Sequence, residues 1–273
     1  MDNDEEPIHV LSLGAGVQSS CMALMAAKGE ITPMPVAAIF ADTKAEPQSV
    51  YDWLDYITPL LPFPVYVVQE KDGLLADVER GIKGSRCSNP PIYTKAEDGT
   101  GGILTRTCTA DYKIRPLIRK TKELVGWKGR KPKEVRCITW IGISLDEIQR
   151  VKESREPWIK HRWPLLEKDM RRHQCLQWMK GNGYPEPPRS ACWFCPYHSN
   201  DEWRRLRDKE PDEWEKAKDL DRRIRSGVYN VKSELYLHKS REPLDEVDLS
   251  TDVERGQTVL DLWNDECDGV CML

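Results

Sequence analysis

The sequence predicts an α/β fold in which a mainly parallel sheet is covered by helices on both faces. Three short apolar, β-branched segments, Ile8–Leu13, Val36–Ala41 and Val65–Gln69, alternate with helix-like stretches. A fourth segment of this kind, Arg136–Ile143, follows a long insertion. Strands separated by crossover helices form right-handed βαβ units and parallel sheets. In such sheets ligands bind beyond the carboxyl ends of the strands, so we expect a ligand site at that edge.

The 273-residue chain has an ordinary soluble composition, with 39% hydrophobic and 32% charged residues. No stretch approaches the roughly 20 consecutive apolar residues that a membrane helix needs. The first residues, MDNDEEP, are acidic where a secretory signal would be basic, so we expect a cytoplasmic protein that binds no membrane. Cytoplasmic thiols stay reduced, so the nine cysteines are expected to be core residues, metal ligands or catalytic thiols rather than disulfides.

The composition changes after Pro164, where charged helices containing tryptophan begin. We therefore expect an α/β domain over residues 1–165 and a helical, metal-binding region over residues 166–273. The expected helices of the second region are Glu167–Lys180, Asn200–Lys209 and Pro211–Ser226. Before them, residues 84–107 are rich in Gly, Pro, Ser and Thr without a helical period, which predicts a long loop that is functional or mobile.

The stretch LSLGAGVQSS, Leu11 to Ser20, is read as the end of a strand, a tight turn and the start of a helix. Small side chains let the free backbone N–H groups of a helix N-terminus approach an anion, so the stretch predicts a phosphate-binding loop. A purely structural turn that packs the helix against the strand is the alternative. The candidate nucleotide-binding residues in this stretch are Ser12, Gly14, Ala15, Gly16, Gln18, Ser19 and Ser20.

Four motifs in order resemble the adenine nucleotide alpha-hydrolase (PP-loop) superfamily, which includes the phosphoadenylyl-sulfate reductases and the ATP-dependent tRNA thiolases. Residues 14–19 resemble its S-G-G-x-D-S loop, and FADTKAEP at residues 40–47 resembles F-x-D-T-G-x-x-F-P. RTCTADYKIRPL at residues 106–117 is similar to C-x-x-x-K-x-x-P-L, and RWPLLEKDM at residues 162–170 to P-[IL]-x-[DE]-W-x-x-x-D. The resemblance implies a Rossmann-like parallel sheet that binds a nucleotide. Two departures are Gln18, where the loop has an acidic residue, and Lys44, where a glycine is usual.

The resemblance implies that the loop holds the phosphates of ATP, with Asp42, Thr43 and Gly142 as further nucleotide-binding residues. In ATP-using relatives a substrate oxygen attacks the α-phosphate, pyrophosphate leaves, and a sulfur or nitrogen nucleophile then displaces AMP. Cys108, Lys113 and Asp42 are the candidate catalytic residues. Lys113, Arg115 or Arg119 could neutralise the leaving phosphates, although a basic surface helix is an equal reading for the two arginines. Mg²⁺ is a further candidate cofactor, which the replacement at Gln18 leaves open.

The pair Cys192-x-x-Cys195 predicts a metal centre, because two thiolates at this spacing can grip one centre in a reduced compartment. Together with Cys108 the pair resembles the three-cysteine pattern of the tRNA 2-thiocytidine enzymes, which implies a [4Fe–4S] cluster with one iron open to sulfide or substrate. His198 could instead complete a zinc site, zinc being the alternative metal. Near the end of the chain, Cys267 and Cys271 are candidate fourth ligands or a redox-active tail, or a terminus without function.

The segment from Lys113 to Arg162 has 15 Lys and Arg residues against six Asp and Glu, although the whole chain has a net charge of −4. This local excess, with tryptophans among basic residues, fits a nucleic acid partner such as tRNA or DNA, and an ordinary solvated helix surface fits it equally. The other expected partners are a nucleotide and a sulfur donor, with a second copy of the chain in a homodimer as a further candidate.

Three functions follow from these observations. The first is an ATP-dependent, iron–sulfur PP-loop enzyme, a sulfurtransferase that adenylates a nucleic acid or nucleoside and inserts sulfur. The second is a reductase of adenylyl sulfate or phosphoadenylyl sulfate, although the E-C-G-x-H segment with the catalytic thiol of that family is absent here. The third is a zinc-stabilised nucleotide- or nucleic-acid-binding module without turnover. The iron, sulfide and zinc content of the protein separates the third function from the other two.

Overall fold

The structure is a computed structural model that describes residues 6–70, 72–129, 132, 134–231, 233–251 and 254–256. Cys267 and Cys271 lie outside the described residues, so their roles as fourth ligands or as a redox tail stay predictions. Within the described part of the chain, no helix has the length and apolar character to cross a bilayer.

The main sheet has five parallel strands in the order β3-β2-β1-β6-β7, which confirms the predicted α/β fold with a parallel sheet. Four of the strands are the predicted ones, and the fifth, β7, follows them along the chain. The prediction missed β7 because its sequence, IKHR, contains three polar residues and no apolar run. The strands are β1 (Ile8–Ser12), β2 (Ala37–Asp42), β3 (Val65–Gln69), β6 (Cys137–Trp140) and β7 (Ile159–Arg162).

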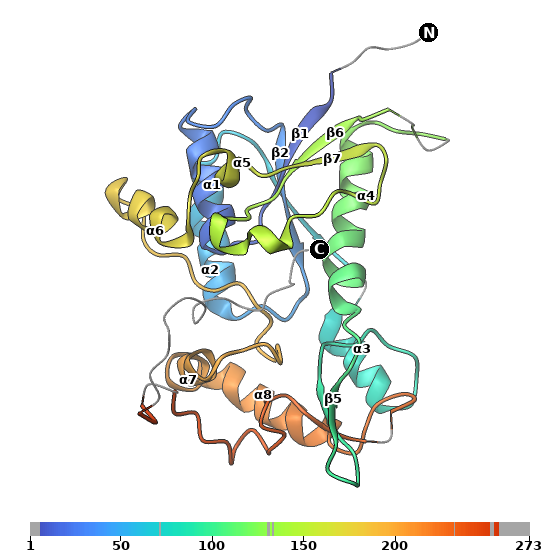
Figure 1. Ribbon diagram of the computed structural model, residues 1–273. Coiled ribbons are helices and arrows are strands. Elements are labelled where there is room, and N and C mark those ends of the chain that lie inside the picture. Colours follow the sequence, from blue (N-terminus) through green and yellow to red (C-terminus); the bar gives the residue numbers. More distant parts are fainter. Residues whose placement is uncertain are drawn as a thin grey trace.

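Helices cover both faces of this sheet (Figure 1). Successive strand residues point to opposite faces, so Leu11 joins a core cluster with α1 and α2, whereas Val10 joins a second cluster with residues of α4. Helix α1 is buried along most of its length because its sequence, VQSSCMALMAA, is apolar on every side. The helices around the sheet are α1 (Val17–Ala27), α2 (Gln48–Ile57), α4 (Arg115–Leu124), α5 (Pro164–Glu167) and α6 (Arg172–Gly181).

A second lobe lies beyond the carboxyl edge of the sheet, in the lower half of Figure 1. Its three antiparallel strands have the order β5-β4-β8, and its core contains the buried side chains of Phe194, Trp203 and Leu220. The elements of this lobe are α3 (Gly73–Ile82), β4 (Tyr93–Lys95), β5 (Gly101–Ile103), α7 (Asn200–Lys209), α8 (Pro211–Ile224) and β8 (Glu234–Tyr236). The expected plain loop over residues 84–107 was wrong in part, because residues 93–103 form the β4–β5 hairpin.

The core of the sheet and the core of the second lobe do not follow the order of the chain. The cluster with α1 and α2 runs from Leu11 to Met179, and the cluster of the second lobe draws on segments from Ala45 to Leu249. The expected division near residue 165 stays a prediction. The helices expected in the second half are present with shifted ends, since Pro164–Glu167 forms a separate turn, α5, before α6 begins at Arg172. Three short turns complete the fold: η1 (Thr58–Leu60), η2 (Ala110–Ile114) and η3 (Leu145–Arg150).

Candidate active site

The glycine turn joins β1 to α1 and is closed by its own hydrogen bonds. The backbone N–H of Gly14 donates to Ser19 Oγ over 3.1 Å, and the Ser19 hydroxyl donates to the carbonyl oxygen of Gly16 over 3.3 Å. Ala15 has a φ of +58°, in the left-handed region that non-glycine residues rarely adopt, and its methyl group is fully buried. The turn is therefore a tight backbone loop at the N-terminus of a helix, as an anion cradle requires.

Gly142, which follows β6, lies directly against this loop. A Cβ atom at this position would come within 2.8 Å of the backbone nitrogen of Ser19, so only glycine fits without movement. Ser20 is different from its neighbour, because its hydroxyl accepts a hydrogen bond from Trp53 Nε1 over 2.9 Å in the buried core. The structure thus places Ser19 and Gly142 at the loop and turns the Ser20 side chain away from it.

A cavity of about 340 Å³ opens beyond the carboxyl ends of β1 and β2. Its volume falls in the range of small-molecule sites. Ser12, Gly14 and Ala41 line it from the sheet, and Lys113 and Leu117 line it from the side of α4. Its position is the one expected for a ligand in a parallel sheet.

Asp42 and Thr43 form the turn after β2 and do not line this cavity. Asp42 Oδ1 accepts hydrogen bonds from the backbone N–H of Lys44, at 2.7 Å, and from the Tyr51 hydroxyl, at 2.8 Å. Lys44, where the related motif has glycine, has a φ of +58°. The Asp42 carboxylate therefore holds a left-handed turn, and its direct role toward a nucleotide stays a prediction. Gln18 is half-buried on the first turn of α1.

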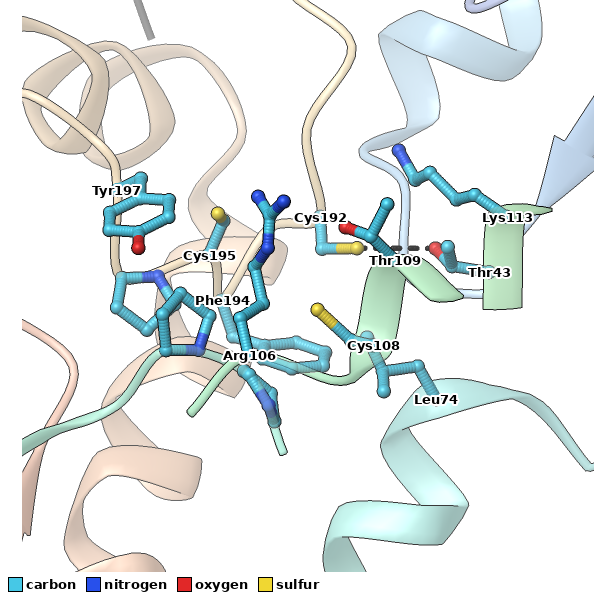
Figure 2. A pocket seen from close by; sticks show the side chains of 13 residues that line it. Thr43, Leu74, Arg106, Cys108, Thr109, Lys113, Cys192, Phe194, Cys195 and Tyr197 are labelled. Atoms are coloured by element: carbon cyan, nitrogen blue, oxygen red, sulfur yellow. Dashed lines mark hydrogen bonds between the residues drawn. The ribbon is translucent and has the colours of Figure 1, made fainter. Parts of the chain in front are cut away.

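The structure brings together Cys108, Cys192 and Cys195, which line a second, smaller cavity (Figure 2). Cys108 comes from the start of the helical segment that leads into α4, and the other two from the loop before α7. Arg106 and Tyr197 line the same cavity. The three thiols that the sequence groups together thus line one pocket, and their role as metal ligands stays a prediction.

The loop that contains Cys192 is fixed to the turn after β2. The backbone N–H of Trp193 donates to the carbonyl oxygen of Ala45 over 2.8 Å. Thr43 Oγ1 lies 3.2 Å from Cys192 Sγ, in a buried contact that is drawn as a dashed line in Figure 2. Three stretches distant in the sequence thus hold the cysteine pocket: the turn after β2, the start of the α4 segment and the C-x-x-C loop.

The Cys192 thiol is neutral in this environment. Burial raises its pKa far above the ordinary value, and the nearby Glu46 carboxylate raises the pKa further, whereas Lys113 and Thr43 act in the opposite direction. A buried thiol of this kind becomes a thiolate when a metal binds, because the metal cation replaces the proton.

The donor chemistry of the pocket fits a thiolate-bound metal centre. Among the described residues, no group of three or more His, Cys, Asp or Glu side chains is placed to hold a single metal ion. In a cluster, each thiolate binds a different iron atom, which needs thiols further apart than one ion does. The cavity itself measures about 30 Å³, and Cys108 and Cys195 in its wall are half-buried.

His198 does not face the three thiols. Its Nε2 lies 3.0 Å from the carbonyl oxygen of Cys192, and its Nδ1 lies 3.4 Å from Glu202 Oε2, with the ring buried. Both ring nitrogens thus contact protein oxygens that fix the C-x-x-C loop. The alternative of a zinc site stays a prediction, and His198 would have to leave these contacts to serve it.

Lys113 lines both cavities and so lies at the wall between them. Its Nζ is 3.3 Å from Glu46 Oε1, and the Glu46 side chain is fully buried. The Ser190 hydroxyl donates to the other oxygen of Glu46 over 3.3 Å, which ties the segment before the C-x-x-C loop to the same carboxylate. The ion pair with Glu46 thus holds the ammonium group of Lys113 at the junction of the two cavities.

A π-helical turn, η2, lies between Cys108 and Lys113. Four residues separate this cysteine and lysine, where the related reductase motif has three. A π turn contains more residues than an α turn and occurs most often at functional sites. The wider turn accommodates the additional residue while Cys108 and Lys113 both still line the cysteine pocket.

Arg115 and Arg119, the two other candidate cations, pair elsewhere. Arg115 Nη2 lies 2.6 Å from Asp111 Oδ1, and Arg119 Nη1 lies 2.8 Å from Glu70 Oε1. Neither residue lines the two cavities, which agrees with the reading of a basic surface helix. The residues that sequence reasoning missed are Arg106, Ser190 and Tyr197, none of which belongs to a pattern that would single it out.

No protein-family model matches the chain, and no curated protein sequence matches it. Among solved structures, the chain is similar to the crystal structure of phosphoadenylyl-sulfate (PAPS) reductase from Candida auris, in a phosphate complex. The sequence identity is 15% and the TM-score 0.46, and the match covers 68% of this chain and 82% of that chain. Similarity at this level transfers neither an activity nor the role of any residue.

Proposed function

We propose that this protein is an ATP-using PP-loop enzyme that adenylates a nucleic acid or nucleoside and then inserts sulfur with the help of an iron–sulfur cluster. The observation that carries the proposal is the position of Lys113, which lines both the cavity beside the glycine turn and the cavity with three cysteines. A nucleotide in the first cavity would have its phosphates close to a sulfur-ligated centre in the second.

The residues of the first cavity fit the adenylation half of this reaction. The backbone amides of the glycine turn would hold the phosphates at the N-terminus of α1. A substrate oxygen forms a bond to the α-phosphorus, and the bond to pyrophosphate breaks. Lys113 would stabilise the negative charge that develops on the phosphates, and the buried Glu46 keeps its ammonium group in place.

The residues of the second cavity fit the delivery of sulfur. Cys108, Cys192 and Cys195 would hold the cluster, which supplies an iron able to carry sulfide. Hydrosulfide from a donor forms the new carbon–sulfur bond, and AMP leaves with the oxygen of the substrate. In the described part of the chain, no Asp, Glu or His side chain lines the cysteine pocket. A fourth position would then be taken by an external ligand, or by Cys267 or Cys271, which lie outside the described residues.

The test is anaerobic purification, with iron, inorganic sulfide and zinc quantified. Incubation with ATP, hydrosulfide and bulk tRNA or DNA follows, while pyrophosphate release is assayed. We expect iron and sulfide in the protein and pyrophosphate release that depends on nucleic acid. Sulfite release from adenylyl sulfate with a thiol donor would instead establish the reductase. Zinc without iron or sulfide, and no pyrophosphate, would establish the binding module.

A further inference from the structure

Arg106 has a buried donor without a partner inside the cysteine pocket. Its Nη1 atom is inaccessible to solvent and makes no hydrogen bond to the described residues. A buried donor that lacks an acceptor costs about 1–3 kcal/mol, and more when the group is charged. Nη1 therefore lacks an acceptor among the described residues, and a ligand in the pocket would supply one.

The surroundings of Arg106 point to an anionic ligand in the same pocket. The residues that line it include Arg106 and Lys113 as cations and no carboxylate, whereas Lys113 has Glu46 as its counterion. Figure 2 shows the Arg106 side chain extending beside Cys192 and Cys195. The carbon of its guanidinium group lies 6.0 Å from the centre of the Tyr197 ring, a cation–π distance that supports this orientation.

We propose that Arg106 is a positioning residue whose Nη1 would donate a hydrogen bond to the inorganic sulfide of an iron–sulfur centre that Cys108, Cys192 and Cys195 would hold. This inference rests on the proposed function. The sulfide has two sources with the same chemistry, a bridging sulfide of the cluster itself or hydrosulfide bound at the open position. Both are soft anions that accept hydrogen bonds, and both need a cation next to a group that three thiolates make negative.

The test compares R106Q and R106K with the wild-type protein after anaerobic reconstitution with iron and sulfide. R207Q is the matched control, since Arg207 lies on α7 in the same lobe and pairs with its neighbour Asp208. The measurements are the iron and sulfide content, the midpoint potential of the cluster by optical titration, and the dissociation constant for added hydrosulfide. Melting temperatures show whether each variant folds.

We expect R106Q to shift the midpoint potential to a more negative value, or to weaken hydrosulfide binding by about tenfold, which is the value of one charge-assisted hydrogen bond. A change in the midpoint alone identifies the cluster sulfide, and a change in hydrosulfide affinity alone identifies the external ligand. R106K keeps the charge without the planar fork, so its values should fall between those of R106Q and the wild type. R207Q should match the wild type.

Two results would overturn the assignment of Arg106 while the proposed function stands. One is an unchanged midpoint and an unchanged hydrosulfide affinity in a folded R106Q or R106K protein that retains its cluster. The other is equal competition by chloride, which would make the pocket a general anion site. If the wild-type protein itself contains no iron or sulfide, the proposed function fails first and the sulfide role of Arg106 fails with it.

Discussion

Thr43 Oγ1 and Cys192 Sγ lie 3.2 Å apart although the two residues are 149 positions apart in the chain. The contact joins the turn after β2 to the C-x-x-C loop that supplies two of the three thiols of the cysteine pocket. A nearby backbone hydrogen bond between Trp193 and Ala45 reinforces the junction. The turn after β2 and the C-x-x-C loop are thus packed as one unit.

Replacing Cys192 with alanine should remove most of the bound iron and sulfide and lower the free energy of unfolding by about 1–2 kcal/mol, since a buried side chain is truncated. Metal analysis and urea unfolding measure the two effects. The control is Cys137→Ala in β6, where burial raises the thiol pKa to about 11 and no cavity with the other thiols is shared. A C192A protein with a full complement of iron would contradict the cluster assignment.

Replacing Lys113 with methionine should abolish nucleotide-dependent turnover and destabilise the fold by about 3 kcal/mol, because the fully buried Glu46 loses its counterion. The double variant K113M/E46Q removes the charge on both sides and should recover much of the stability without recovering turnover. Urea unfolding and a pyrophosphate assay separate the two roles. Normal turnover in the stable double variant would rule out a catalytic role for Lys113.

Replacing Ser19 with alanine should weaken ATP binding about three- to tenfold and leave the iron content unchanged, since Gly14 loses the hydrogen-bond acceptor that closes the turn. Calorimetric titration with ATP measures the change. Ser20→Ala is a closely matched control, because the neighbouring hydroxyl bonds to Trp53 in the core. Equal ATP affinities of the two variants would count against a phosphate role for the loop.

Replacing Gly142 with alanine should weaken ATP binding by about tenfold or more and cost about 1–3 kcal/mol of stability, because the added Cβ would lie 2.8 Å from the Ser19 nitrogen. Gly181→Ala, at the end of α6, meets no atom within 4 Å and should be neutral or slightly stabilising. The same titration and unfolding measurements apply. Wild-type ATP affinity in G142A would show that the loop position does not matter for binding.

His238 should make stability fall in mild acid. Burial, assisted by the charge of Lys239, lowers its pKa to about 4 in the folded protein from an ordinary value of 6.5. The unfolded chain therefore binds the proton more readily between these values, so this stability is complete above pH 6.5 and is lost as the pH falls toward 4. Nδ1 accepts a hydrogen bond from the backbone N–H of Ser240 over 3.1 Å, which protonation would break.

The expected loss between pH 7.5 and about pH 5 is roughly 1–2 kcal/mol. Urea unfolding of the wild-type protein and of H238Q at both pH values measures it, since glutamine does not titrate. The difference between the two proteins removes the contribution of the carboxylates. Parallel pH dependence of the two proteins would show that His238 does not titrate as described.

The parallel sheet could be predicted because its central strands are runs of apolar, β-branched residues, such as Ile8–Leu13, which periodicity detects. The edge strand β7 escaped since IKHR has no apolar run and gains its place from pairing with β6. The β4–β5 hairpin escaped for a similar reason. Its strands have three residues each, and β4 pairs with β8, which is more than 130 residues further along the chain.

At the site, spacing and residue type indicated the glycine turn and the three cysteines, and the structure places them on two adjoining cavities. The pairing of Lys113 with Glu46 and the position of Arg106 could not be predicted, since both depend on how α4 crosses from one lobe to the other. Ser20 was grouped with Ser19 because sequence alone does not tell which hydroxyl of a helix start faces the core. Only packing against Trp53 decides that.

The positions of the three cysteines in the chain decide when the cysteine pocket can be completed during synthesis. Cys108 leaves the ribosome long before Cys192 and Cys195, and the parallel sheet, complete at Arg162, can form in the interval. A nascent chain that stops short of the C-x-x-C loop contains the glycine turn but only one of the three thiols. Any group bound between these three sulfurs must therefore arrive after translation of residue 195, when all five strands of the parallel sheet have already been synthesised.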